Sequence, residues 1–191
     1  MSNHHLHLYT APANSGKTEF TLGRATQAAR QLSGDVIVCV ATNEQAKQWR
    51  RRLAQSGGGL SIHAITFERL MRNILEMAGT AVTQITEPVQ FRILRQLLQN
   101  DQTTLTHYQP IREKVGLVQV LEALMSEFKN ALATPEQLQN IWSTAAPRLT
   151  EIGQLYATYH TLLTQNHWAD NDGLGWLALE TLVQNREIGR R

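Results

Sequence analysis

Cysteine, long apolar runs and an excess of charge of either sign are all scarce in this chain of 191 residues, and each shortage excludes a class of protein. The single cysteine, Cys39, excludes an internal disulfide and a zinc site built from several cysteines. The longest apolar runs, such as Val36–Ala41, are far too short to span a bilayer. The net charge of +2 is only weak evidence for a polyanionic partner. We therefore expect a soluble, globular protein of the cytoplasm that has no membrane partner.

The stretch Ala11–Thr18 reads Ala-Pro-Ala-Asn-Ser-Gly-Lys-Thr and lies between two segments of different pattern. The apolar, strand-like segment His5–Thr10 precedes it, and a helical pattern that starts at Glu19 follows it. This order predicts a phosphate-binding loop, in which backbone NH groups and the amino end of a helix surround the phosphates. Ala11 stands where such loops usually carry their first glycine, and Asn14 offsets this in part because asparagine tolerates a positive φ. The alternative is an ordinary Ser-Gly turn.

Each residue of such a loop has an expected role. Lys17 is expected to reach the β and γ phosphates of ATP, and Thr18 to place its hydroxyl on Mg²⁺. The expected nucleotide-binding residues are Ala13, Asn14, Ser15, Gly16, Lys17, Thr18 and Glu19. The seven histidines predict no further metal site, since no pair of them has helical spacing beside a carboxylate.

Up to about residue 84 the sequence alternates between strand and helix patterns. A helix with Phe20 on its inner face ends at 33–35, and the unbroken apolar run Val36–Ala41 is typical of a strand buried on both faces of a parallel sheet. Thr42-Asn43 opens a second helix, Leu60–Thr66 is a third strand, and a third helix stops at Gly79. Three strand-then-helix units predict a parallel, right-handed α/β layer structure over residues 1–84, with Cys39 as a small core residue.

From Thr86 onward the apolar period is that of helices only. Successive helices are expected after Thr86, over Ile111–Ala131, after the capping box Thr134–Gln137, and over Pro147–Gln165. Their apolar stripes, which include Val89 and Val115, predict the core of a helical subdomain over residues 85–168. A last helix over 171–185 belongs to a segment, 169–191, that is expected to return to the α/β core.

Several segments follow, in order, the motifs of a known family. They are Ala11–Thr18 (motif I), Ala41–Ala46 (motif Ia), Ile65–Leu70 (the "TFxxL" segment), Glu127–Asn130 with Thr134–Leu138 (subdomain 1B), and Asp170–Leu174 (the helix start before the Walker B strand). In this order the chain resembles the amino-terminal part of superfamily 1 DNA helicases of the UvrD/RecB type, and most closely the AddB-like subunits of helicase-nucleases.

The resemblance implies a P-loop NTPase, RecA-like α/β fold whose parallel sheet carries an inserted all-helical subdomain. It implies an ATP-driven motor or helicase-nuclease subunit of DNA repair, with single-stranded DNA, a second RecA-like domain and a helicase-nuclease partner subunit as partners. The DNA path in such proteins is lined by the segments that correspond here to Thr42, Asn43, Thr66 and Phe67. Small polar side chains at strand ends can bind phosphates, and an aromatic face can stack a base. Alternatively, Thr42 and Asn43 only cap a helix and Phe67 is a core residue.

The sequence departs from the family pattern in ways that bear on activity. No upstream glutamine motif precedes the loop, and no apolar strand ending in Asp-Glu follows Thr66. Without the Walker B carboxylate, the catalytic base and an arginine finger, we expect these 191 residues to be a fragment that binds ATP but does not hydrolyse it alone.

Two other functions fit a loop of this type. One is a small P-loop phosphotransferase that resembles nucleoside kinases, although the chain lacks a second acidic strand and a basic lid. The other is a structural subunit that binds nucleotide without catalysis. The basic run Arg50-Arg51-Arg52 is either a solvated helix face or a phosphate contact.

Overall fold

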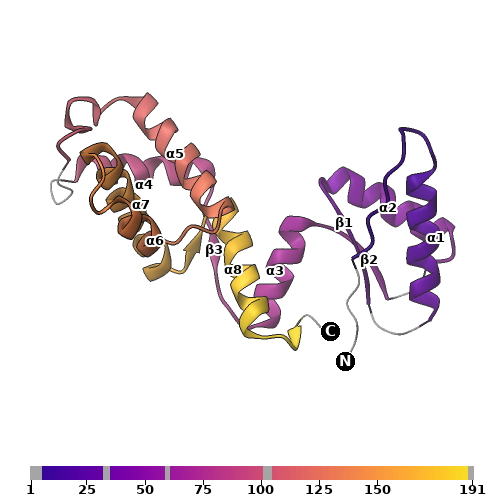
Figure 1. Cartoon of the computed structure of the whole chain (residues 1–191). Helices are drawn as coiled ribbons and strands as arrows, with labels where there is room; N and C mark the ends of the chain where they lie inside the picture. Colours follow the sequence, from indigo (N-terminus) through magenta and orange to yellow (C-terminus); the bar gives the residue numbers. More distant parts are fainter. Residues whose placement is uncertain (1–5, 32–34, 59–60, 101–104, 189–191) are drawn as a thin grey trace. The chain divides into compact units, whose positions relative to one another are not determined.

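The computed structural model describes residues 6–31, 35–58, 61–100 and 105–188 and divides the chain into two compact units. The first unit covers residues 1–70 and the second covers residues 71–190. Each unit is described separately, with the labels of Figure 1. The domain limits expected after residues 84 and 168 stay predictions.

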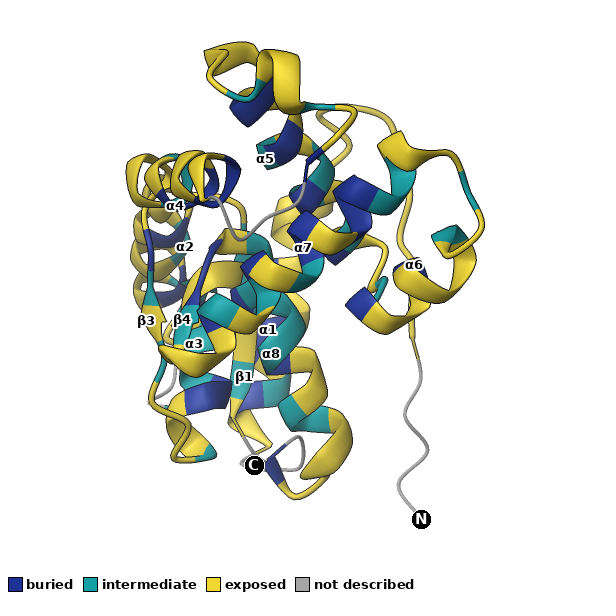
Figure 2. Ribbon diagram, turned by 90° about the vertical axis from the view of Figure 1, so that its left-hand side faces the viewer, coloured by how far each residue is buried: buried dark blue, intermediate teal, exposed yellow. Residues whose placement is uncertain are grey.

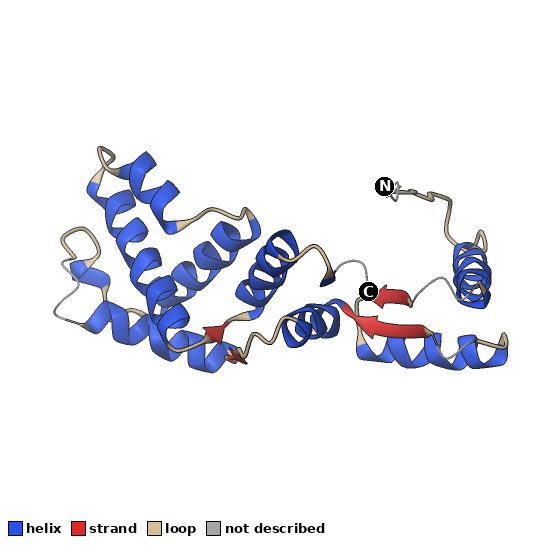
Figure 3. Ribbon diagram, turned by 90° about the horizontal axis from the view of Figure 1, so that it is seen from below, coloured by secondary structure: helices blue, strands red, loops and turns tan. Residues whose placement is uncertain are grey.

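The first unit is a small β-α-β arrangement preceded by a helix. Its elements are α1 (Lys17–Arg30), β1 (Val36–Val40), α2 (Asn43–Gln55), β2 (Ile62–Thr66) and the start of α3 (Phe67–Met77). Strands β1 and β2 pair in parallel, with Val36 opposite Ile62 and Val40 opposite Thr66 (Figure 3). The predicted parallel strands and the helices between and after them are confirmed in this unit.

One face of this two-stranded sheet is covered and the other is open. Val38 and Ala64, which are partners in the register, pack in one cluster with Leu22 of α1 and Leu53 of α2. Neighbouring positions point the other way, so Ile37 keeps 49% of its surface exposed. The prediction of a strand buried on both faces was therefore wrong for β1. Side chains of both α1 and α2 pack in the cluster on the Val38 face, and the Ile37 face stays exposed. Cys39 is accordingly only half-buried.

The first expected strand does not form in the described part of the segment. His5 lies outside the described residues, and residues 6–10 have no regular structure, with Leu6 98% and Leu8 86% exposed. A strand needs a hydrogen-bonded neighbour, and the described sheet pairs only β1 with β2. Phe20, expected on the inner face of its helix, is also exposed. The expected strand and the expected burial of Phe20 were both wrong, because an apolar pattern does not specify which element packs against the apolar residues.

The second unit is mainly helical. Its elements are the remainder of α3, β3 (Thr83–Gln84), α4 (Glu87–Gln99), the 3-10 turn η1 (Gln109–Ile111), α5 (Val115–Asn130), α6 (Pro135–Trp142), α7 (Pro147–Gln165), β4 (Trp168–Ala169) and α8 (Asn171–Gln184). The predicted helices after Thr86, from the capping box at Thr134, and over α7 and α8 are confirmed. Helix α5 begins later than the predicted Ile111, because extended backbone at Lys114 separates it from the 3-10 turn.

The apolar stripes of α4, α5 and α7 form the core of this unit, as the periodicity predicts. Buried residues are dark blue on the ribbon of Figure 2. The largest fully buried side chains are Tyr156, Tyr159, Leu94, Leu98, Leu121, Met125, Leu155 and Val118. Phe128 packs its ring edge-to-face with those of Trp142 and Tyr156. Val89 and Val115 were wrongly expected in this core. Both lie in the first turn of a helix and remain exposed.

A short parallel pairing of β3 with β4 was not foreseen. Thr83 pairs with Trp168 and Gln84 with Ala169, so two segments more than 80 residues apart in the chain lie side by side. The prediction that all regular structure after Thr86 is helical was therefore wrong at 168–169. Two residues are too few to show the alternation of apolar and polar residues that marks a strand. The formation of such a strand also depends on a partner that is distant in the sequence.

A buried carboxylate holds residues 106–108, which lie between α4 and α5. Glu151 of α7 is 4% exposed and accepts hydrogen bonds from the backbone NH groups of Thr106, His107 and Tyr108 at 2.7, 2.7 and 3.1 Å. The Thr106 hydroxyl donates to the same carboxylate at 2.6 Å. Burial by itself would raise the pKa of Glu151, but these hydrogen bonds to the charged form outweigh it and lower the pKa.

The substitution Glu151→Gln should destabilise the second unit by about 1–3 kcal/mol at neutral pH, because an amide presents an NH₂ group to backbone donors. The folded pKa of Glu151 is lowered from 4.5, so its contribution is complete above 4.5 and is lost as the pH falls through the folded pKa. The difference between wild type and variant should therefore narrow in acid. Urea unfolding followed by tryptophan fluorescence at several pH values measures this, with the exposed Glu113→Gln as control. An equal effect of both variants would contradict the role of the Glu151 hydrogen bonds.

Candidate functional site

The loop before α1 makes its turn with two residues in the left-handed region. Asn14 has φ 59° and Gly16, at the helix N-cap, has φ 84° and ψ 11°. Gly16 adopts this conformation without the strain that a side chain would bring, and asparagine tolerates it better than most residues. At both positions the backbone has a positive φ, which glycine and asparagine tolerate better than other residues.

The Lys17 side chain folds back onto the start of the loop. Its Nζ donates hydrogen bonds to the carbonyl oxygens of Ala11 and Pro12, each at 2.6 Å. An ammonium group has three donors, so a further donor is available to a ligand beside the loop. A surface cavity of about 380 Å³ lies here, and its lining residues are Tyr9, Thr10, Ala11, Ser15, Gly16, Lys17, Phe20 and Thr21. The loop therefore combines an ammonium group with an adjacent space.

The other predicted nucleotide-binding residues continue from the loop into the helix. Ala13 and Ser15 are exposed in the loop, and Thr18 and Glu19 are exposed in the first turn of α1. The Glu19 carboxylate forms an ion pair with Arg52 of α2 at 3.1 Å. Arg52 is thus engaged within the protein. Arg50 is engaged as well, because its Nε donates to the carbonyl of Ala64 at 3.1 Å.

The four predicted DNA-binding residues come together at one edge of the sheet. Val40 pairs with Thr66, so the ends of β1 and β2 lie side by side. Phe67 follows Thr66 directly, and Thr42 and Asn43 come two and three residues after Val40. The structure gives Phe67 an exposure of 55%, so the alternative of a core residue is wrong. Carboxyl ends of parallel strands are where open α/β sheets bind ligands.

Both threonines at this edge cap the helices that follow. Thr42 Oγ1 accepts the backbone NH of Gln45 at 3.2 Å, and the Gln45 side chain accepts the NH of Thr42 at 3.3 Å. Thr66 Oγ1 accepts the backbone NH of Arg69 at 3.3 Å. A hydroxyl that accepts such a bond still carries a donor hydrogen, so a capping role does not exclude a contact to a phosphate.

A buried polar network in the second unit was not identified from the sequence. Lys129 Nζ forms an ion pair with Asp170 Oδ2 at 2.5 Å, and both side chains are almost fully buried. The Tyr159 hydroxyl donates to the same oxygen at 2.7 Å, while Asp170 Oδ1 accepts the NH of Gly173 at the start of α8 at 2.7 Å. The signal was present, because Lys129 follows Met125 by four residues on the buried stripe of α5.

Burial dominates the titration of this network. It lowers the pKa of Lys129, although the Asp170 carboxylate opposes the shift, and it raises the pKa of Tyr159, to which the charge of Asp170 adds. Lys129 Nζ also lies 4.9 Å from the centre of the Tyr159 ring, a cation-π distance. The ammonium is therefore held by Asp170 and by an aromatic face, which is a structural role.

These features define a mixed α/β protein with short parallel strands, a helical unit, and a lysine-closed loop before its first helix. The chain belongs to the family described as "ADDB, N-terminal", which matches residues 8–188. Among the residues that the structure describes, no helix is long and apolar enough to cross a membrane.

Two relatives show how much of a longer protein the chain represents. It is 26% identical over 161 residues to an ATP-dependent helicase/deoxyribonuclease subunit of Natranaerobius thermophilus, covering 79% of this chain and 14% of the relative. It is 23% identical over 180 residues to the protein of the same name from Staphylococcus aureus strain JH9, covering 88% of this chain and 16% of the relative. The matched region is thus about one seventh of the first relative's length and about one sixth of the second's.

The cap at Thr42 has a local test. Thr42→Ala should lower the protection of the Gln45 amide against hydrogen exchange by roughly 2- to 30-fold, which corresponds to a lost cap of about 0.5–2 kcal/mol. Thr42→Ser should retain most of the protection because it keeps the hydroxyl. Thr134→Ala, which removes the equivalent cap of α6, serves as the control and should leave Gln45 unchanged. Unchanged protection in Thr42→Ala would show that this hydrogen bond does not hold the first turn of α2.

Proposed function

We propose that this chain is the amino-terminal part of a subunit of an ATP-dependent helicase-deoxyribonuclease that acts in DNA repair in the cytoplasm. The observation that carries the proposal is the family match over residues 8–188, together with the names of the relatives. The remainder of such a subunit, with a second RecA-like domain, and a helicase-nuclease partner subunit are the protein partners of the proposal. The family match favours this function over a small phosphotransferase.

The nucleotide site of the proposal is the loop with the first turn of α1. Ala13–Thr18 and the NH of Glu19 would surround the phosphates of ATP, where the positive end of the dipole of this 14-residue helix favours anions. Lys17, already held over the loop by two carbonyl groups, would direct its remaining donor toward the phosphates. The Thr18 hydroxyl would hold Mg²⁺, which neutralises phosphate charge when bound. The residues present fit these ligands, and the positive φ values at Asn14 and Gly16 support the fit.

The proposed DNA path runs over the sheet edge with Thr42, Asn43, Thr66 and Phe67. The hydroxyl hydrogens of the two threonines and the amide of Asn43 supply donors to phosphate oxygens. The exposed ring of Phe67 supplies a stacking face for a base. Since Arg50 and Arg52 have partners within the unit, Arg51 is the residue of the basic run whose charge is most available for a phosphate.

Lys17→Ala should weaken binding of Mg²⁺-ATP by roughly 10- to 150-fold, because a charge-assisted contact contributes about 1.5–3 kcal/mol. Titration of a fluorescent ATP analogue into the full chain measures the affinity. The control is Lys47→Ala, which removes an exposed lysine of α2 that is paired with Glu44. Equal affinities for wild type and Lys17→Ala would disprove the phosphate-loop assignment.

Phe67→Ala should weaken binding of a short single-stranded oligonucleotide by about 1–3 kcal/mol without a change in the salt dependence. The reason is that stacking involves no phosphate charge. Arg51→Ala should instead flatten the log-log salt slope by about 0.7, the contribution of one phosphate on a single strand. Fluorescence anisotropy at several salt concentrations measures both.

Phe20→Ala, which removes another exposed aromatic ring of the same unit, is the matched control for Phe67→Ala and should leave DNA affinity unchanged. Tighter binding of duplex than of single strands, or an equal effect of both phenylalanine variants, would place the DNA path elsewhere.

A further inference from the structure

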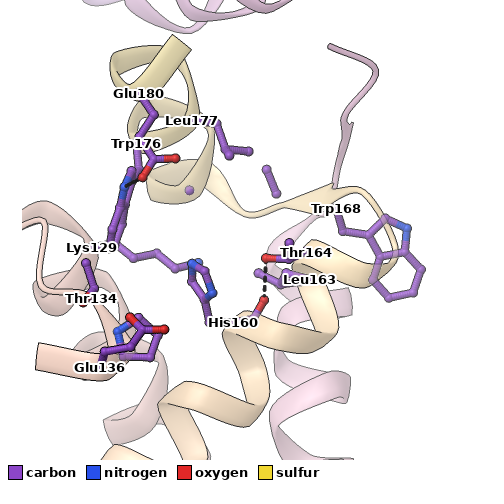
Figure 4. Close-up of a pocket in the computed structure, with 13 residues that line it drawn as sticks. Lys129, Thr134, Glu136, His160, Leu163, Thr164, Trp168, Trp176, Leu177 and Glu180 are labelled. Atoms are coloured by element: carbon purple, nitrogen blue, oxygen red, sulfur yellow. Dashed lines mark hydrogen bonds between the residues drawn. The ribbon is translucent and has the colours of Figure 1, made fainter. Parts of the chain in front are cut away.

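A second cavity lies within the helical unit, between α6, α7 and α8 (Figure 4). Its volume is about 260 Å³. The side chains used below are Glu136 from the first turn of α6, His160 from α7, Trp176 and Glu180 from α8, and Lys129 from α5. The cavity thus has charged and aromatic walls and room for a long side chain.

The walls carry unbalanced negative charge. Neither Glu136 nor Glu180 forms an ion pair within the described part of the chain, and neither is buried. Lys129 is the one cation among the described lining residues, and its charge is balanced by Asp170 at 2.5 Å. Burial lowers the pKa of His160 and the charge of Lys129 lowers it further, although Glu136 and Glu180 oppose the shift, and this favours the neutral imidazole. Hydrogen bonds from its own backbone NH and from the Thr134 side chain stabilise the charged form of Glu136 and lower its pKa, but no described cation balances the charge of Glu136 or Glu180.

Aromatic faces complete the walls. The indole NH of Trp176 donates to Glu180 Oε1 at 2.7 Å, which fixes the ring and leaves the second carboxylate oxygen available. The rings of His160 and Trp176 lie 5.9 Å apart at a tilt of 52°. A carboxylate held beside an indole, as Glu180 is beside Trp176, attracts organic cations, since both the negative charge and the π face favour a positive group.

We propose that this cavity is a docking site for an arginine side chain presented by a partner protein. A guanidinium group suits it better than an ammonium, because its plane can stack on the indole while its NH groups reach a carboxylate. The seven non-hydrogen atoms of an arginine side chain fit the volume. Nucleic acid is disfavoured as the occupant, because Glu136 and Glu180 repel phosphates. The site goes beyond the proposed ATP and DNA functions and does not depend on either.

The first test uses the full chain labelled with ¹⁵N and the indole NH signal of Trp176, assigned by its loss in Trp176→Phe. N-acetyl-arginine amide should shift this signal in a saturable way at millimolar concentrations. N-acetyl-citrulline amide, which has nearly the same shape without the charge, should not. No shift with the arginine probe, or the same shift with both probes, would overturn the proposal.

Variants on two different helices test the charges. Glu136→Gln and Glu180→Gln should each weaken binding of the arginine probe about threefold to tenfold, between the values for an exposed ion pair and a charge-assisted hydrogen bond. Glu127→Gln removes an exposed carboxylate of α5 that does not line the cavity and should leave binding unchanged. Equal affinities in wild type and in both cavity variants would exclude a carboxylate-based site.

Two further probes decide the source of the cation. A pentapeptide with arginine between two alanines on each side should bind at least as tightly as free arginine, because the site is open at the surface and the free carboxylate is repelled. Tighter binding of free arginine would indicate a small-molecule site in place of a protein-docking site. A shift of the Trp176 signal by a single-stranded oligonucleotide, with none by the peptide, would assign the cavity to nucleic acid.

Discussion

Parallel pairing of β1 with β2 is the constraint on which the candidate DNA site depends. The pairing of Val40 with Thr66 brings together two helix starts that are more than 20 residues apart in the sequence. The cluster of Val38, Ala64, Leu22 and Leu53 then fixes α1 and α2 on the sheet. The loop that precedes α1 is attached to the same small core. Burial of about five side chains therefore supports every residue proposed to contact nucleotide or DNA, so the site is sensitive to changes in that core.

The helical unit depends on a different interaction, the buried ion pair between Lys129 and Asp170. Asp170 receives hydrogen bonds from α7 through Tyr159 and from the first turn of α8 through Gly173, so one carboxylate joins α5, α7 and α8. The loss of one partner would leave a buried charge uncompensated, which costs far more than the pair itself contributes. The same pair neutralises the lysine beside the proposed arginine site. The ion pair between Lys129 and Asp170 thus leaves the cavity without a net positive charge from Lys129.

Much of the helical unit could be predicted because its signals are local. A capping box at Thr134–Gln137 and a repeating stripe such as Val118, Leu121 and Met125 each specify a helix without reference to the rest of the chain. The short strands β3 and β4 could not be predicted, since each exists only through the other. For the apolar segment 6–10 the error was the opposite one, a predicted strand that does not form. Its pattern indicates a strand, but no described strand pairs with it.

By itself the sequence determined the starts of the helices with a capping box, such as those after Thr42 and Thr134, the residues with left-handed backbone in the loop, and the resemblance to one family. Each of these depends on residue type and spacing over a few turns of chain. Tertiary structure decided that Phe67 is exposed and that Glu136 and Glu180 flank one cavity. Those facts depend on which elements pack together, and packing is fixed by contacts between residues distant in the chain that no local pattern encodes.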